Sequence, residues 1–156
     1  MADAPNIKTI GVIGAGQMGN GIAHVSALSG YDVVLSDVSL DRAKAALDII
    51  SGNLDRQITK GLIAESDKAG ALSRITPSES LGDMAQAQVV IEAATENEEV
   101  KKKIFADVCQ YLSDDAILCT NTSSISITRL AASTDRAERF MGMHFMNPVP
   151  VMQLVE

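Results

Sequence analysis

At 156 residues, 46% hydrophobic and 21% charged, the chain is long enough for one globular domain with a buried core. Its net charge of −7 and its lack of a basic cluster argue against a nucleic-acid partner. The first residues hold no apolar signal core, and no apolar run approaches the roughly 18 residues that a transmembrane helix needs. We therefore expect a cytoplasmic protein with no membrane span.

The two cysteines, Cys109 and Cys119, fall on a predicted helix and a predicted strand. This placement is typical of buried thiols in a reducing compartment. We predict neither a disulfide nor a metal site.

A glycine-rich turn follows the first predicted strand. The strand covers residues 7–13, and a helix over residues 17–29 stops at Gly30. Gly14 would allow a tight turn, Gly16 would let a diphosphate approach the backbone, and Gly19 would let the helix pack close to the strand. Free N–H groups at the start of the helix would face that anion, helped by the helix dipole.

The second predicted strand, residues 32–36, ends at Asp37, which lies 18 residues after Gly19. A carboxylate there can accept hydrogen bonds from the 2′- and 3′-hydroxyls of an adenosine ribose. Its charge would repel a 2′-phosphate, so we predict NAD rather than NADP, although Arg42 lies nearby in the sequence. A purely structural strand–helix–strand unit is the alternative.

The rest of the chain alternates between helical and extended patterns. Helices are predicted over residues 40–60 (capped by Ser39 or Asp41), 64–72, 97–112 and 125–132 (capped by 122–124), and strands over 75–76, 88–92, 117–120, 140–144 and 151–155. This alternation predicts an α/β fold with a doubly wound, mostly parallel sheet, a Rossmann-type dinucleotide-binding domain. Because a strand is predicted up to the last residue, we expect residues 1–156 to be one domain of a longer protein; a natural stand-alone domain is the alternative.

A histidine follows one of these strands, at the edge where cofactors bind in such sheets. His144 could take the proton of an alcohol while hydride leaves the adjacent carbon. Glu156, 12 residues on, would return beside it if the turn at residues 148–150 reverses the chain. A hydrogen-bonded structural histidine is the alternative. For His24, which lies within the first helix, we favour packing or solvent exposure over a chemical role.

Four stretches, in this order, resemble the NAD-binding domain of the 3-hydroxyacyl-CoA dehydrogenases. They are Gly-Ala-Gly-Gln-Met-Gly (14–19), Glu-Ala-Ala-Thr-Glu-Asn (92–97), Asn-Thr-Ser-Ser (121–124) and His-Phe-Met-Asn-Pro-Val-Pro-Val-Met-Gln-Leu-Val-Glu (144–156). The resemblance covers essentially the whole chain and is greatest to the bacterial 3-hydroxybutyryl-CoA type. It implies NAD-dependent, reversible oxidation of the 3-hydroxyl of a short-chain 3-hydroxyacyl-CoA, from 3-hydroxybutyryl-CoA to acetoacetyl-CoA.

The resemblance also implies roles for individual residues. His144 would be the catalytic base, Glu156 its partner, and Ser123 a contact to the substrate 3-oxygen. The implied cofactor contacts are Gly14, Ala15, Gly16, Gln17, Met18, Gly19, Asp37, Glu96, Lys101, Ser123 and Asn147, and the implied CoA contacts are Asn53, Lys60 and Ser123. Asn53 stands where some relatives have serine. Taken alone, the charge run over residues 96–103 is instead typical of a solvated helix.

The family places an all-helical domain after the point where this sequence stops. That domain closes over the acyl-CoA and makes most of the dimer interface, so the resemblance implies a homodimeric parent enzyme. Because loosely held reactants react slowly, we expect the 156-residue chain to bind NAD but to turn over poorly or not at all. The alternatives are a nucleotide-binding module without catalysis, and a lysine-dependent 3-hydroxy acid dehydrogenase, whose glycine loop has a methionine where this chain has Met18.

Overall fold

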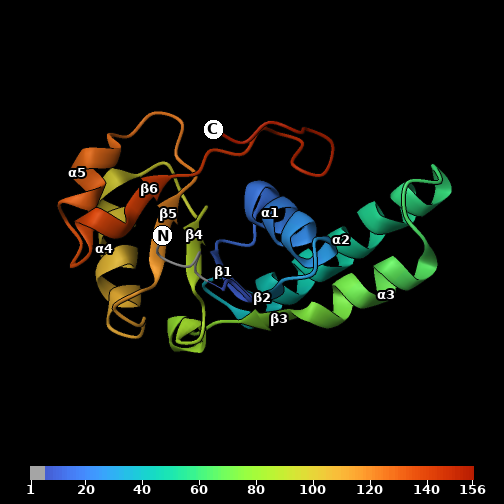
Figure 1. The fold of residues 1–156 in the computed structure, drawn as a ribbon, viewed down its shortest axis with the longest axis horizontal. Helices are drawn as coiled ribbons and strands as arrows, with labels where there is room; N and C mark the ends of the chain where they lie inside the picture. The colour runs from blue at the N-terminus through green and yellow to red at the C-terminus, as the bar shows by residue number, and fades with distance from the viewer. Residues whose placement is uncertain (1–5) are drawn as a thin grey trace.

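The computed structural model describes residues 6–156, and its framework is a six-stranded parallel sheet in the order β3-β2-β1-β4-β5-β6 (Figure 1). The strands are β1 (Thr9–Ile13), β2 (Asp32–Ser36), β3 (Ile75–Ser78), β4 (Val89–Glu92), β5 (Ile117–Thr120) and β6 (Phe140–Gly142). The strand order reverses between β1 and β4, which is where ligands bind in doubly wound sheets. The predicted α/β fold is confirmed.

Helices cover both faces of the sheet (Figure 1). On one face lie α1 (Gln17–Leu28), α2 (Leu40–Thr59) and α3 (Glu65–Arg74), and on the other lie α4 (Glu98–Cys109) and α5 (Ile127–Ala131). Short 3-10 helices, η1 (Leu81–Met84) and η2 (Ala137–Arg139), occupy two connections. Each face has its own apolar core, the first built around Ile22, Ile50 and Leu54 and the second around Phe105 and Leu130.

Capping residues explain where the helices on the first face begin and end. The Ser39 hydroxyl accepts a hydrogen bond from the Arg42 N–H at 3.4 Å, so Ser39 rather than Asp41 caps α2. Gly30 and Gly61 follow the ends of α1 and α2 at φ +97° and +70°. Glycine reaches this left-handed conformation without a steric cost, and the chain turns there.

Three expected elements differ from the structure toward the end of the chain. The cap of α5 is Ser126, whose hydroxyl accepts from the Arg129 N–H at 3.3 Å, and the 122–124 stretch is not part of that helix. Strand β6 stops at Gly142, before His144. Residues 151–155 form no strand, only an antiparallel bridge between Phe145 and Val155, because two prolines that lack N–H donors hold residues 148–151 in a turn.

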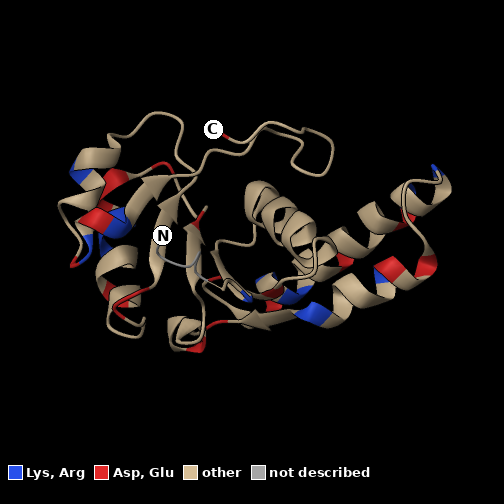
Figure 2. Cartoon of the chain, in the orientation of Figure 1, with Lys and Arg blue, Asp and Glu red and all other residues tan. Residues whose placement is uncertain are grey.

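Charged side chains avoid one part of the surface (Figure 2). Helix α1 and residues 143–155 carry no Lys, Arg, Asp or Glu. In the described part of the chain, no helix has both the length and the apolar character needed to cross a membrane. Because α1 carries no charged side chain, an anion bound near its start would meet backbone groups rather than basic side chains.

Candidate functional site

The glycine loop between β1 and α1 has no room for a side chain at two of its positions, Gly14 and Gly19. Gly14 has φ +100°, and a Cβ there would lie 2.6 Å from the Ala94 Cα. A Cβ at Gly19 would lie 1.5 Å from the Gly14 carbonyl oxygen, so the helix packs against the turn itself. No atom lies within 4 Å of the place where a Cβ at Gly16 would stand. The loop is therefore closed on two sides and open at Gly16.

The start of α1 offers free backbone donors. Its N-cap, Gly16, makes no side-chain cap, and the first turn holds no acidic residue. The N–H groups of a first helical turn have no partner within the helix, and the helix dipole favours an anion beside them. The open space at Gly16 and these donors fit a diphosphate.

Asp37 ties the end of β2 to the glycine loop. One carboxylate oxygen accepts from the Ala15 N–H at 2.8 Å, and the other accepts from the Val38 N–H at 2.7 Å. The Arg42 Nε lies 3.1 Å from this second oxygen, on a side chain that is 65% exposed. The carboxylate thus borders a cavity of about 320 Å³ whose lining also includes Gly14 and Ile104.

A second cavity, of about 260 Å³, lies on the other side of the loop, toward β4 and β5. It is lined by Gly16, Gln17, Met18, Ala93, Ala94, Thr95, Glu96, Lys101 and Asn121. The glycine loop contributes to both cavities. Two cavities that flank one diphosphate-binding loop are what a dinucleotide requires, one for each nucleoside.

Lys101 lines this second cavity, yet its ammonium group is already paired inside the protein. Its Nζ lies 2.5 Å from a carboxylate oxygen of Glu92, and the two side chains are 1% and 0% exposed. The same Glu92 carboxylate accepts from the Thr120 hydroxyl and the Ala94 N–H, both at 2.8 Å. The interpretation of residues 96–103 as a solvated helix is wrong for Lys101, which shares the buried face of α4 with Phe105.

Glu96 joins the loops that follow β4 and β5. Its carboxylate accepts from the Thr122 hydroxyl at 2.7 Å and from the Ser124 hydroxyl at 3.4 Å. Ser123 lies between these two residues and is exposed. The bonds to Glu96 thus hold the ends of the loop that presents Ser123.

His144 and Glu156 come together as the sequence predicts. Their backbones exchange two hydrogen bonds, His144 N–H to Glu156 O at 2.8 Å and Glu156 N–H to His144 O at 2.9 Å. Their side chains approach to 3.4 Å between Nδ1 and Oε2, with exposed fractions of 29% and 63%. With Nδ1 facing the carboxylate, Nε2 is the ring nitrogen free for another partner.

The turn at residues 148–150 lies directly on α1. A Cβ at Gly21 would stand 2.7 Å from the Val149 Cβ, so this glycine lets the turn approach the helix. Gly21 lies outside the glycine motif, and this role was not predicted from the sequence. Asn147 and Asn53 line a cavity of about 400 Å³ beside Gly16. Asn53 also lines the neighbouring cavity with Lys60, along residues 148–153.

His24 and Cys119 are ionisable groups outside this edge. His24 is fully buried, and its Nε2 lies 2.9 Å from the Gln57 Oε1, so its interpretation as a packing residue is confirmed. Burial lowers the pKa of His24, although the hydrogen bond to Gln57 partly opposes this effect. Burial raises the pKa of the Cys119 thiol to about 12, which leaves it a poor nucleophile.

Known proteins resemble this chain over nearly its whole length. Residues 9–156 match the family described as 3-hydroxyacyl-CoA dehydrogenase, NAD binding domain. A 3-hydroxybutyryl-CoA dehydrogenase of Bradyrhizobium diazoefficiens is 62% identical over 96% of this chain and 51% of its own length. A 3-hydroxyadipyl-CoA dehydrogenase of Escherichia coli is 44% identical over 97% of this chain and 32% of its own length.

A solved structure shows the same likeness in three dimensions. The crystal structure of (S)-3-hydroxybutyryl-CoA dehydrogenase from Ralstonia eutropha superimposes with a TM-score of 0.94 at 49% identity, covering 96% of this chain and 53% of that one. The chain thus spans about half the length of the Bradyrhizobium and Ralstonia relatives.

Proposed function

Because the chain belongs to the NAD-binding domain family of the 3-hydroxyacyl-CoA dehydrogenases, we propose that it serves the reversible, NAD-dependent oxidation of a short-chain 3-hydroxyacyl-CoA, with 3-hydroxybutyryl-CoA as substrate and acetoacetyl-CoA as product. One observation carries the proposal. The open glycine loop and the His144–Glu156 pair belong to the same edge of the sheet, as the carboxyl ends of parallel strands require.

His144 is the general base in this proposal. Its free Nε2 takes the proton from the substrate 3-hydroxyl, and the Glu156 carboxylate at Nδ1 orients the ring and stabilises the imidazolium that results. Bound NAD supplies the hydride acceptor for the hydrogen on carbon 3. The electron pair of that C–H bond leaves with the hydride, and the electron pair of the O–H bond closes the new carbonyl. Ser123, exposed after β5, donates to the substrate 3-oxygen.

Cofactor binding falls to the residues around the two cavities. Backbone donors of residues 14–19 hold the diphosphate, and Asp37 accepts from the adenosine ribose. Glu96 lines the cavity toward β4 and β5, where Lys101 acts through its pairing with Glu92. Asn147 lines the cavity beside Gly16, and the exposed Ser123 follows β5; both are proposed to contact the nicotinamide half of the cofactor. The loop that holds the diphosphate is uncharged, so NAD affinity should depend on backbone donors more than on ion pairs.

Two residues of α2, Asn53 and Lys60, are the proposed CoA contacts. Both line the cavity along residues 148–153, and Lys60 brings a positive charge that suits a CoA phosphate. We also propose a homodimer that assembles through a further helical domain, and the relatives of about twice this length have room for such a domain. The exposed Val151 and Leu154, at 71% and 55%, support a covering element there. We also place the protein in the cytoplasm, where its two free cysteines would stay reduced.

Calorimetric titration with NAD, combined with NADH formation from 3-hydroxybutyryl-CoA on the same sample, tests this proposal. We expect NAD to bind and turnover to be weak. Binding without any turnover would mean an intact cofactor domain whose chemistry needs the rest of the enzyme, since the chain spans about half the length of its relatives. A failure to bind NAD would overturn the assignment of the glycine loop and Asp37.

A further inference from the structure

The chain leaves the sheet just before His144. The β5–β6 ladder ends with Thr120 opposite Gly142, and one further backbone bond follows, from the Met143 N–H to the Thr120 carbonyl at 2.9 Å. Beyond Thr120 the segment that follows β5 turns away from β6, because Thr122 bonds to Glu96 across the edge of the sheet. His144 therefore stands where the regular backbone ladder has stopped.

The side chain of Asn121 continues the ladder. Its Oδ1 accepts a hydrogen bond from the Phe145 N–H at 2.8 Å, across 24 residues of sequence. Asn121 is itself fixed, since its backbone N–H donates to the Glu92 carbonyl at 2.8 Å and only 8% of the residue is exposed. Glu92 is the buried residue paired with Lys101, so this anchor reaches a polar cluster in the interior of the molecule.

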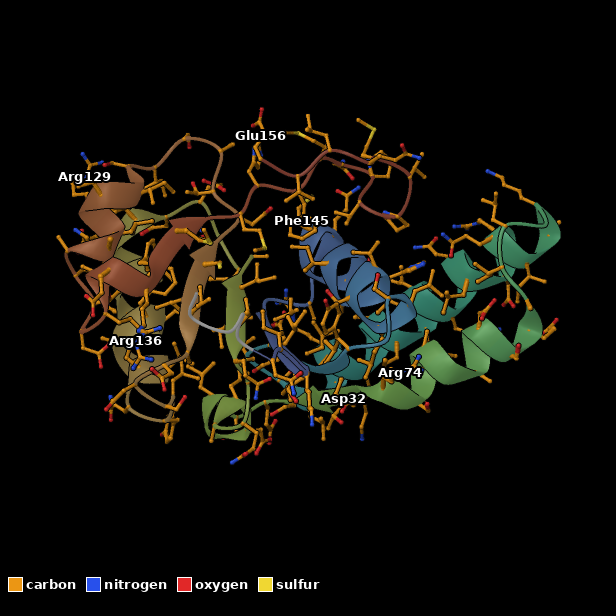
Figure 3. The ribbon with its side chains drawn as sticks, in the orientation of Figure 1. Asp32, Arg74, Arg129, Arg136, Phe145 and Glu156 are labelled. Atoms are coloured by element: carbon orange, nitrogen blue, oxygen red, sulfur yellow. The ribbon has the colours of Figure 1, made fainter. Side chains whose placement is uncertain are left out.

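His144 thus lies between two anchored neighbours. Met143 is bonded to the end of β5, Phe145 is bonded to Asn121, and Phe145 also packs against the core cluster beneath α1. Figure 3 shows Phe145 and Glu156 on the same side of the molecule, near the start of α1. The contacts of His144 with Glu156, by contrast, join it only to the far end of the same segment.

We propose that Asn121 is a positioning residue for His144. By holding the Phe145 N–H, it fixes the backbone on both sides of the base and sets the imidazole relative to the cavity that Asn121 itself lines. The inference rests on the proposed function, because it assumes that His144 is the base. Asn121 acts through Phe145 and needs no contact with the substrate.

Three variants test this role: Asn121→Ala, Asn121→Asp and, as a matched control, Ser126→Ala. Alanine removes the acceptor, aspartate keeps an oxygen acceptor of the same reach, and Ser126→Ala removes an exposed helix cap that does not touch the segment around His144. The readouts are hydrogen exchange at the Phe145 and Met143 amides by NMR, NAD affinity by calorimetry, and the rate of NADH formation from 3-hydroxybutyryl-CoA.

In Asn121→Ala we expect exchange at the Phe145 amide to accelerate about tenfold, as the loss of one buried hydrogen bond predicts. Protection at Met143 should stay unchanged, which shows that the fold is intact. The maximal rate should fall about tenfold because the base is less well placed. Asn121→Asp should restore both Phe145 protection and rate, and Ser126→Ala should change neither.

Unchanged Phe145 exchange in Asn121→Ala would overturn the inference. So would a rate loss in Asn121→Asp as large as that in Asn121→Ala with Phe145 still protected, because the amide nitrogen would then act directly. If the unaltered chain forms no NADH, that result counts against the proposed function alone, since exchange at Phe145 decides the positioning by itself.

Discussion

Two acid–base pairs belong to the same edge of the sheet, and they are built in opposite ways. Glu92 and Lys101 are buried, 2.5 Å apart, and the carboxylate has further donors in Thr120 and Ala94. His144 and Glu156 are partly exposed, with 3.4 Å between Nδ1 and Oε2. The first pair and its further donors join β4, the loop that follows it, α4 and β5, whereas the second pair joins two ends of one short segment.

The difference separates a structural role for Glu92 and Lys101 from the catalytic role that we propose for His144. A buried ion pair is held in one state because losing either partner leaves an uncompensated charge in the interior. A base must exchange a proton during each turnover, and it needs access to its substrate and a partner that tolerates both charge states. The exposed, longer contact of His144 meets that need, and the buried contact of Glu92 supports the frame around it.

Replacing Glu92 with leucine should have the largest effect on the molecule. The Lys101 ammonium would stay buried with no counter-charge, and breaking such a pair costs about 3–5 kcal/mol of unfolding free energy. Urea denaturation followed by circular dichroism measures this loss. The double variant Glu92→Leu with Lys101→Met should recover most of it, since a well-packed apolar pair replaces a buried ion pair at little cost. Equal stability of the single and double variants would show that the pair is not what holds this edge together.

Replacing His144 with glutamine should lower the rate of the reaction and leave the stability of the fold unchanged, the opposite of what we expect for Glu92→Leu. We expect NADH formation to fall about 100-fold, the lower end of what a general base contributes, while urea stability and NAD affinity stay unchanged. The imidazole is partly exposed and its backbone bonds to Glu156 do not involve the ring. Initial rates at saturating NAD and substrate give the comparison, and Ser126→Ala, at an exposed helix cap, should leave the rate unchanged. Undiminished turnover in His144→Gln would remove this histidine from the chemistry.

Asp37 lies between the two extremes, because its carboxylate is held by the glycine loop yet borders a cavity. Asp37→Asn should weaken NAD binding about tenfold, as expected when hydrogen bonds to a charged acceptor become bonds to a neutral one. NADP binding should improve relative to NAD, because the repulsive charge is gone and Arg42 loses its partner. Calorimetry with both nucleotides measures the ratio. Adding Arg42→Gln should cancel the gain for NADP, and a gain that survives would assign it to another residue.

The fold follows from local patterns, and most of its elements were therefore predictable. The period of apolar residues and the caps locate α1, α2 and β2 closely, because these signals lie within the element itself. The expected strand over residues 151–155 failed because the run Val151–Val155 directly follows two prolines that hold residues 148–151 in a turn. An apolar run predicts burial, but strand pairing also needs a free neighbouring edge and donors at the right register.

Site residues could be predicted where a sequence motif or turn indicates their role. They could not be predicted where their contacts arise only from the tertiary structure. The glycines and the return of Glu156 beside His144 could be anticipated from motif and turn. The burial of Lys101 could not, because its neighbours in sequence are charged, although the Phe105 four residues on marks the same helical face. Asn121 gave no signal of its own, since its partner, Phe145, is 24 residues away.

His24 supplies the smallest effect and a third kind of ionisable group, one buried without a charged partner. Burial lowers its pKa from 6.5, and its Nδ1 has no hydrogen-bond partner among the described residues. As the pH falls below about 6.5, His24 is therefore protonated in the unfolded chain while it stays neutral in the folded chain. Stability is complete above that pH and declines below it, until the pH reaches the lowered pKa of the folded state.

This linkage predicts a slope of at most about 1.4 kcal/mol per pH unit in unfolding free energy just below pH 6.5, measured by urea denaturation in steps of pH. His24→Gln, whose amide can still donate to Gln57, should flatten the slope in that window, whereas His144→Gln should leave the contribution of His24 in place. A slope of the same size in His24→Gln would assign the pH dependence elsewhere. A flattened slope would show that burial alone, with no ion pair, suffices to couple the protonation of this histidine to folding.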